Sequence, residues 1–421
     1  MYLTIGNLPA SICGSSNSLA IVTIALLPVF PPKKDNKTQE RYHHGIQDVL
    51  RRILPKFQPA SVNGREISCA DGRSRICHPI ACAWLADHPE KMSFLGLNRN
   101  GCGHCEIPPD CLGEYEDEYP TRDHFRYRQI IRYQDPVNPT LDQKERDQRV
   151  KQITRETGLK TFPLKVWELE DVSCHELFAP DTLHCIWIGV FSHLMGWIIG
   201  FLKKHGRIDL FNSAWLACPE SPGFRKPQKI YSALKKWTGF ENRSAGKILL
   251  LYLAVALKNP EPGQTRDFRM ALKCVRNFMD FTLPCHFRPH TDRTIRYMRR
   301  YLEDFHNAKD TFLEFRAHKK AKAEATKVGS LVRTELSNLD EPSRQQDIMA
   351  ADIRDQAKVA EIDALRDKSD FNFPKIHFLE HLPAHISSYR YLGQYSTEIS
   401  ERAHKTQIKE GWKKSNHVDA M

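Results

Sequence analysis

Ile67-Ser68-Cys69-Ala70-Asp71-Gly72 is the stretch on which the fold prediction rests, because it reads as a short strand that ends in an Asp-Gly turn. A carboxylate at the end of a strand is one half of a site for magnesium, which prefers hard oxygen ligands. The other half stands far along the chain, where Glu398 and Glu401 begin a predicted polar, basic helix and can face one site. An Asp-Gly pair is more often only a turn, and a basic helix more often only a solvated surface, so neither segment alone indicates catalysis.

The composition favours a polyanionic partner. The chain has 421 residues, enough for two or three domains, and its 62 Lys and Arg outnumber its 51 Asp and Glu, for a net charge of +11. Such an excess attracts nucleic acid, because neutralising phosphates releases counterions. The basic residues are spread along the chain, so the charge supports a nucleic-acid partner without locating its binding site.

Two apolar runs bear on the question of a membrane. Residues 19–29 are too few to span a bilayer and are rich in β-branched side chains, which predicts a buried strand. Residues 185–202 are long enough, but they contain Ser192, His193 and several glycines, which favours a core helix. We therefore expect no membrane partner, and we expect the twelve cysteines to be reduced thiols.

The first hundred residues alternate between strand and helix patterns. The predicted strands are residues 1–7, 19–29, 66–70 and 92–97, and the predicted helices are residues 39–54 and 78–87. This β-β-α-β-α-β order is the ribonuclease H order without its first strand. Residues 106–158 are predicted to be loop-rich, residues 183–315 helical, and residues 320–370 an exposed helix or linker.

An ordered series of short motifs carries a resemblance to a known family. The chain resembles the Plavaka-type transposases of fungi, which are relatives of the CACTA DDE transposases. The matching motifs are Tyr-Leu-Thr-Ile-Gly-Asn (2–7), Cys-Ala-Asp-Gly-Arg (69–73), Ala-Asp-His-Pro-Glu (86–90), Cys-Gly-His-Cys (102–105), Pro-Asp-Thr-Leu-His (180–184), Trp-Thr-Gly (237–239), Phe-Pro-Lys-Ile-His (373–377) and the Thr-Glu to His cluster (397–404).

The resemblance implies an α/β fold with a large α insertion. A ribonuclease H-like mixed sheet would be interrupted by a mainly helical insertion domain before the last catalytic helix. The expected regions are the first part of the core (1–100), a CxxC-containing loop-rich segment (101–170), the helical insertion (171–319), a charged linker (320–370) and the final catalytic helix region (371–421).

For catalysis, the resemblance implies DNA cleavage and strand transfer at two Mg²⁺ or Mn²⁺ ions about 4 Å apart. Asp71 is the predicted second carboxylate of the DDE set, with Asp87 as its rival, although a carboxylate before His-Pro is typical of a helix cap. Glu401 is the predicted glutamate and Glu398 its alternative. Double-stranded DNA at transposon ends is the expected partner, and its backbone is expected to contact Arg402, His404, Lys405 and Lys409.

A zinc site is predicted from Cys102 and Cys105, whose spacing allows two thiolates to bind one ion. In CACTA-like transposases a D-x-x-H motif accompanies the CxxC, so the resemblance implies His184 as a third ligand and Asp181 or Cys174 as the fourth. The alternatives are that the thiols are simply buried and that Asp181 is a further catalytic carboxylate. A second histidine pair, residues 377 and 381, is interpreted as structural packing on a helix.

The first catalytic aspartate of the family lies on a strand that would precede Tyr2. None of residues 1–31 is acidic, so nothing in the opening strands replaces it. We therefore expect an N-terminally truncated transposase that is inactive as given. The alternative is a domesticated or degenerate remnant that at most binds DNA or a protein. A nuclear location and a homo-oligomer are further expectations from the family.

Overall fold

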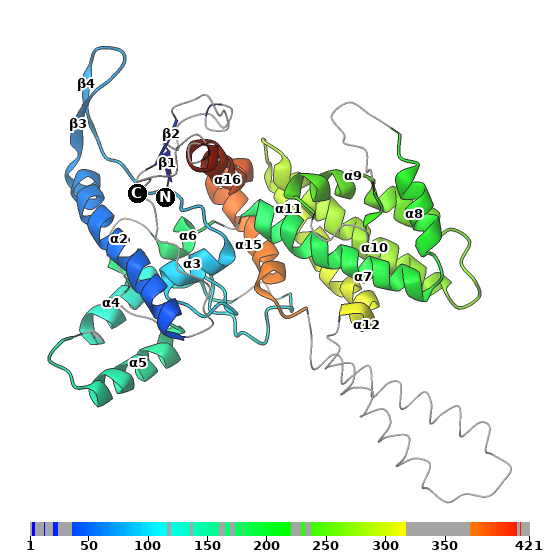
Figure 1. The fold of residues 1–421 in the computed structure, drawn as a ribbon, viewed down its shortest axis with the longest axis horizontal. Helices are drawn as coiled ribbons and strands as arrows, with labels where there is room; N and C mark the ends of the chain where they lie inside the picture. Colours follow the sequence, from blue (N-terminus) through cyan, green and yellow to red (C-terminus); the bar gives the residue numbers. More distant parts are fainter. Residues whose placement is uncertain are drawn as a thin grey trace, which may run out of the picture. The chain divides into compact units, whose positions relative to one another are not determined.

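The computed structural model of the protein forms two compact units (Figure 1). The first comprises Met1–Pro109, Glu116–His184 and Ala384–Met421, and the second comprises Asp110–Tyr115 and Cys185–Pro383. The structure describes residues 2–4, 12, 20–23, 36–316, 371–410 and 413, except for gaps at 116–118, 135–137, 160–163, 165, 169–172, 180, 220–228 and 232–236.

The first unit combines helices with two small antiparallel hairpins. One hairpin pairs β1 (Tyr2–Thr4) with β2 (Ile21–Thr23), and the other pairs β3 (Arg65–Ser68) with β4 (Ser74–Cys77). The helices are α2 (Asn36–Asn63), α3 (His88–Leu95), α4 (His124–Gln134), α5 (Gln143–Thr157), η1 (Val166–Glu168), α6 (Cys174–Leu177), η6 (Leu392–Tyr395), α16 (Glu398–Ala403) and η7 (His404–Lys409).

The core of the first unit forms where α2 and α3 meet η1. Ile46 and Leu50 lie four residues apart on α2 and are both buried, as helical periodicity predicts. Phe94 and Leu95 of α3 are fully buried in the same cluster. The indole nitrogen of Trp167 donates a hydrogen bond to the Leu95 carbonyl at 3.1 Å, so its polar edge is satisfied within the core.

The second unit is helical. Its elements are η2 (Leu183–Val190), α7 (Phe191–Lys204), α8 (Ile208–Leu216), α9 (Gly239–Ala256), α10 (Thr265–Thr282), η4 (Pro284–His286), α11 (Asp292–Ala308), η5 (Lys309–Phe312), α12 (Leu313–Arg316) and α15 (Pro374–Tyr389). Aromatic contacts join them: Phe201 of α7 meets Phe312 edge-on at 5.7 Å, and Phe278 of α10 meets Phe305 of α11 at 5.3 Å. The boundary between the units passes through η2 after His184 and through α15 after Pro383, so each of these helices belongs to both units.

One helix, Leu183–Lys204, is long and apolar enough to cross a membrane by length and composition. In the structure 67% of its most apolar window is buried, as in the core helix of a soluble protein. This agrees with the predicted core helix at residues 185–202.

Several sequence predictions are confirmed by the described residues. The strands at 2–4, 21–23 and 65–68, the helix α2 and the helical character of residues 183–315 are present. The strand at 21–23 is not buried as predicted, since Val22 is 56% exposed. The predicted linker at 320–370 lies outside the described residues. Within those residues the strands form two separate two-stranded sheets, and the mixed ribonuclease H-like sheet stays a prediction.

Three local predictions were wrong. Residues 78–87 form no helix, and the strand expected at 92–97 is instead part of α3. Helix α3 begins at His88 because the Asp87 carboxylate accepts a hydrogen bond from the Glu90 amide at 2.9 Å, and because Pro89 fits the first turn. The segment expected to be loop-rich contains α4 and α5, and α5 begins with a capping box between Asp142 and Glu145.

Candidate functional site

A buried carboxylate joins two distant segments of the first unit. The side chain of Asp181 is only 4% exposed. One of its oxygens accepts hydrogen bonds from the backbone amides of Leu183 (3.2 Å) and Thr397 (3.0 Å). The other accepts from the backbone amide of His184 (3.0 Å) and from the Thr397 hydroxyl (2.7 Å), and lies 2.6 Å from Nδ1 of His184. Asp181 therefore fixes the residue that precedes α16 against the start of η2.

His184 lies between two carboxylates. Its Nδ1 contacts Asp181, and its Nε2 is 3.5 Å from Oε1 of Glu401 on α16. The hydrogen bond with Asp181 is the largest cause that raises the pKa of His184, and the negative charges of Glu401 and Asp87 add to it. Burial raises the pKa of Asp181, but the hydrogen bonds from His184 and Thr397 outweigh burial and hold that pKa below its usual value. The contact therefore favours the charged form of both side chains.

Asp87 belongs to the same neighbourhood, because its charge is one of those that raise the pKa of His184. One carboxylate oxygen caps α3, as the sequence predicts, by accepting from the Glu90 amide. Burial is the main cause, and the charge of Asp87 the second, that raises the pKa of Glu90 to about 7. The charges of Asp87 and Glu401 thus both act on His184, and the charge of Asp87 also acts on Glu90. A cation in this neighbourhood would be attracted by the negative charges of Asp87 and Glu401 and would favour the neutral form of His184.

Asp71 is placed in a different setting from the one predicted. It lies in the exposed turn between β3 and β4, and its two oxygens accept hydrogen bonds from the guanidinium of Arg75 at 2.8 and 2.6 Å. This contact lowers the pKa of Asp71. No hydrogen bond or ion pair of the described residues links Asp71 with Glu401. The hairpin turns the Asp71 carboxylate toward Arg75, and the predicted pairing of Asp71 with Glu401 stays a prediction.

The other predicted residues of the final helix are placed as follows. Glu398 begins α16 and is half-buried, with its backbone amide donating to the Ser396 hydroxyl at 3.3 Å. The four residues predicted to contact DNA follow Glu401 on α16 and η7, and all are exposed: Arg402, His404, Lys405 and Lys409.

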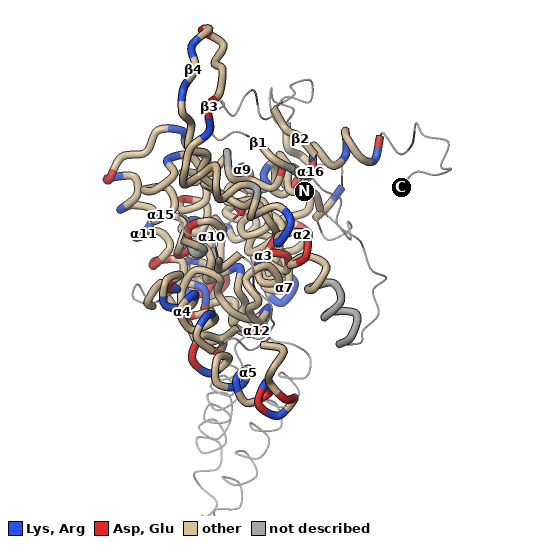
Figure 2. Tube along the Cα trace, turned by 90° about the vertical axis from the view of Figure 1, so that its left-hand side faces the viewer, with Lys and Arg blue, Asp and Glu red and all other residues tan. Residues whose placement is uncertain are grey.

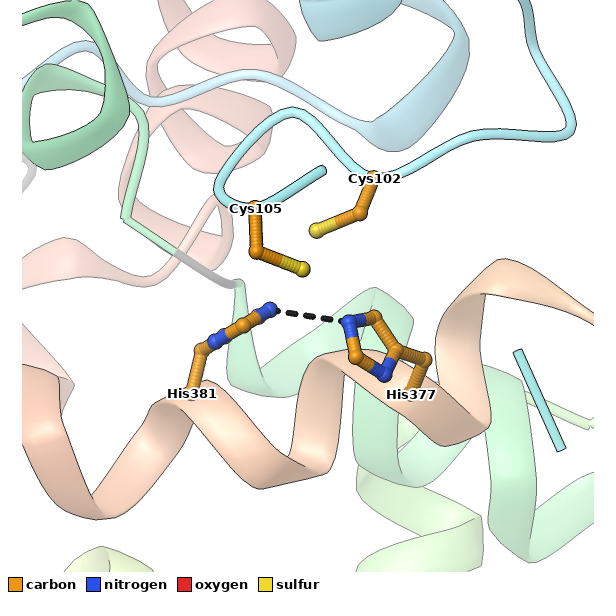
Figure 3. A group of neighbouring side chains, drawn as sticks. All are labelled: Cys102, Cys105, His377 and His381. Carbon is orange, nitrogen blue, oxygen red and sulfur yellow. Dashed lines mark hydrogen bonds between the residues drawn. The ribbon is translucent and has the colours of Figure 1, made fainter. Parts of the chain in front are cut away.

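A second cluster combines two thiols and two imidazoles. Cys102 and Cys105 lie in the loop after α3, and His377 and His381 lie one turn apart on α15. One ligand atom of each lies within 4.8 Å of all the others. In Figure 3 both sulfur atoms and both imidazole rings converge on one space. Two Cys and two His side chains form the donor set of tetrahedral structural zinc.

Neighbouring groups contact two of these four side chains. The His104 amide is 3.2 Å from the Cys102 sulfur, and Nδ1 of His377 is 3.4 Å from a Glu380 carboxylate oxygen. Such outer contacts leave Nε2 of His377 facing the cluster, where it is 3.1 Å from Nε2 of His381. Contact with the Cys102 thiol and then burial raise the pKa of Cys105. A metal ion that bound both sulfur atoms as thiolates would replace the contact between the two thiols that raises this pKa.

The structure groups the predicted thiol pair with other donors than the predicted ones. His184 and Asp181 are engaged with Thr397 and Glu401, and the cluster contains neither. The side chain of Cys174 lies outside the described residues. The histidine pair interpreted as packing supplies the donors instead. Its four-residue spacing, which places both rings on one helix face, was the available signal.

The first 198 residues match the model of the Plavaka transposase family. No curated protein and no solved structure matches the chain.

The Plavaka match contains only part of each of two clusters, the group around His184 and the group of two thiols and two imidazoles. It contains Asp87, both cysteines of the thiol pair, Asp181 and His184, and it ends before the residues that meet them from further along the chain: Thr397, Glu401, His377 and His381. In each cluster, residues inside the matched span are completed by residues beyond it.

Proposed function

We propose that the chain derives from a DDE-type transposase and that the neighbourhood of His184 is its divalent-metal site. Asp87 and Glu401 are the proposed metal ligands. The observation that carries the proposal is the position of His184, which is held by Asp181 and lies 3.5 Å from the carboxylate of Glu401. The Plavaka match over residues 1–198 supports a transposase origin.

The proposed role of each carboxylate depends on whether its oxygens already accept hydrogen bonds from the protein. Asp181 is surrounded by donors on both oxygens, so it acts as an anchor and has no lone pair directed at a metal. Glu401 is 57% exposed at its side chain and can turn toward a cation. Asp87 uses one oxygen as a helix cap and keeps the other. Glu90 offers a third carboxyl group, which a bound cation would deprotonate.

Magnesium or manganese ions at such carboxylates would polarise a phosphodiester and stabilise the attacking and leaving oxygens, the chemistry of DNA cleavage and strand transfer. The protein's own contribution is to fix the ligands. Asp181 holds the backbone and hydroxyl of Thr397 and so sets where α16 begins, and His184 holds Glu401. The exposed basic residues that follow Glu401 suit a DNA backbone.

We propose that the cluster of Cys102, Cys105, His377 and His381 binds one structural zinc ion. The ion would tie the cysteine loop to α15, and the fit of four convergent donors with oriented outer contacts supports this role. Because all four positions would be filled by protein, this zinc would have no open site for catalysis.

Titration of the zinc-loaded chain with Mn²⁺, followed by electron paramagnetic resonance, tests the proposed ligands. Asp87→Asn and Glu401→Gln are each expected to weaken Mn²⁺ binding at least tenfold, whereas Asp71→Asn is expected to leave it unchanged. Weakening by Asp71→Asn with normal binding by Asp87→Asn would restore the sequence-based assignment and overturn this one. Mn²⁺ binding that none of the three changes alters would leave a DNA- or protein-binding remnant as the better description.

A further inference from the structure

The β3–β4 hairpin is exposed along its whole length. Every residue of β3 is exposed, and only the last residue of β4 is partly covered. Ile67 and Ile76 are 47% and 63% exposed, so the ribbon buries no core of its own. Figures 1 and 2 both show the hairpin as a projecting ribbon, and Figure 1 shows it beyond the end of α2. A two-stranded ribbon without a covered face is marginal in water, which points to a partner surface.

The strand register gathers the arginines of the hairpin on one face. Arg65 is paired with Cys77, and Ile67 with Arg75, so these residues share one side of the ribbon. The backbone amide of Cys69 donates to the Arg73 carbonyl at 2.8 Å, which continues the same alternation and adds Arg73 to that face. The opposite face carries the remaining paired residues: Glu66, Ser68, Ser74 and Ile76.

The tip of the hairpin is fixed by local bonds. Gly72 has a φ of +76°, a conformation that L side chains rarely adopt. The Asp71 carboxylate accepts from the backbone amide of Arg73 at 3.2 Å and from both guanidinium nitrogens of Arg75. Asp71 is thus already neutralised by Arg75. Arg65 and Arg73 have no carboxylate partner in the part of the chain that the structure describes, so the free charge on this face is positive.

We propose that the face of the β3–β4 hairpin defined by Arg65, Arg73 and Arg75 binds double-stranded DNA. This inference rests on the proposed function, because it adds a contact for the same substrate away from the metal site. The major groove is about 12 Å wide and admits a two-stranded ribbon. Alternate residues of a strand are about 6.8 Å apart, which lets successive arginines reach successive phosphates along the groove edge.

The double variant Arg65→Ala/Arg73→Ala tests the proposal. Binding of the full chain to a fluorescein-labelled 30-base-pair duplex is followed by anisotropy at several KCl concentrations. We expect several-fold weaker binding, and a slope of log affinity against log salt that is smaller by about 2, since each lost phosphate contact contributes about 0.9. Lys151→Ala/Arg155→Ala removes the same charge from exposed positions of α5 and is expected to preserve both quantities.

Equal binding by the hairpin variant and the original chain would overturn the proposal, as would an equal loss in the α5 control. A chain that binds no duplex at all would overturn it too. A self-association that the hairpin variant abolishes, with DNA binding unchanged, would assign the ribbon to a second copy of the chain instead. None of these outcomes touches the Mn²⁺ titration, so failure of the hairpin proposal and failure of the metal-site proposal are distinguishable.

Discussion

Asp71 and Asp181 make the same contact in opposite surroundings. Each carboxylate has a basic nitrogen at 2.6 Å, from Arg75 in one case and from His184 in the other. The first pair is about half exposed, with 48% of each side chain open to solvent, whereas the side chain of Asp181 is 4% exposed. Water and salt screen the first pair, but the second must be satisfied by protein alone. The comparison shows that burial, and not the local sequence motif, separates an anchor from a surface ion pair.

The largest effect on stability is expected from substitution of a buried thiol of the Cys/His cluster, compared with substitution of an exposed thiol. Cys102→Ser is expected to remove one equivalent of zinc from the purified protein and to lower its melting temperature strongly, because metal binding contributes directly to folding. Cys82→Ser, at an exposed thiol, is the matched control and is expected to change neither. Zinc content by mass spectrometry checks this. If His184→Gln lost the zinc and His381→Gln kept it, the ligands would be those predicted from the sequence, with His184 in place of the histidines of α15.

The second-largest effect on stability is expected from substitution of Asp181, the buried carboxylate that holds Thr397. Asp181→Ala is expected to lower the free energy of unfolding by about 3–5 kcal/mol, because it leaves His184 and the donors of Thr397 without their partner. Urea unfolding measures the change. Asp71→Asn, which removes the exposed counterpart, is expected to leave the midpoint unchanged. Equal effects of the two substitutions would mean that burial does not distinguish these pairs.

The Glu90 carboxyl predicts a pH dependence of stability. Burial favours its protonated form and raises its pKa from 4.5 in the unfolded chain to about 7. Its contribution is therefore fully present below pH 4.5 and is lost as the pH rises through 7. We expect the difference in unfolding free energy between the original chain and Glu90→Gln to change by about 2–3 kcal/mol over that interval. A difference that is flat with pH would place Glu90 in contact with water.

The smallest effect is expected at the hairpin arginines. Arg75→Gln separates Asp71 from its partner, and we expect no measurable change in the urea midpoint, because exposed ion pairs contribute little. Hydrogen exchange of the hairpin amides is expected to increase, since the side-chain fork closes the turn. Unchanged exchange would mean that the backbone bonds of the turn alone hold it.

Local signals in the sequence predicted much of this structure. The capping role of Asp87 followed from the His-Pro that comes after it, and α2 from the spacing of residues such as Ile46 and Leu50. The thiol pair was evident from its spacing. Besides the local errors at residues 78–97 and 106–158, the remaining failures were long-range. Nothing local shows that the charges of Asp87 and Glu401 both act on His184, and nothing local shows which distant histidines meet the cysteines.

Iron-mediated cleavage of the backbone tests whether Asp87 and Glu401 share a metal site beside His184. Fe²⁺ replaces Mg²⁺ at oxygen ligands, and ascorbate with peroxide then cuts the chain near the bound ion. Zinc-loaded protein keeps the cluster of cysteines and histidines occupied. We predict cuts next to residues 87, 184 and 401, all suppressed by excess Mg²⁺ and lost in Glu401→Gln. Cuts next to residue 71 together with 401, and none at 87, would contradict it.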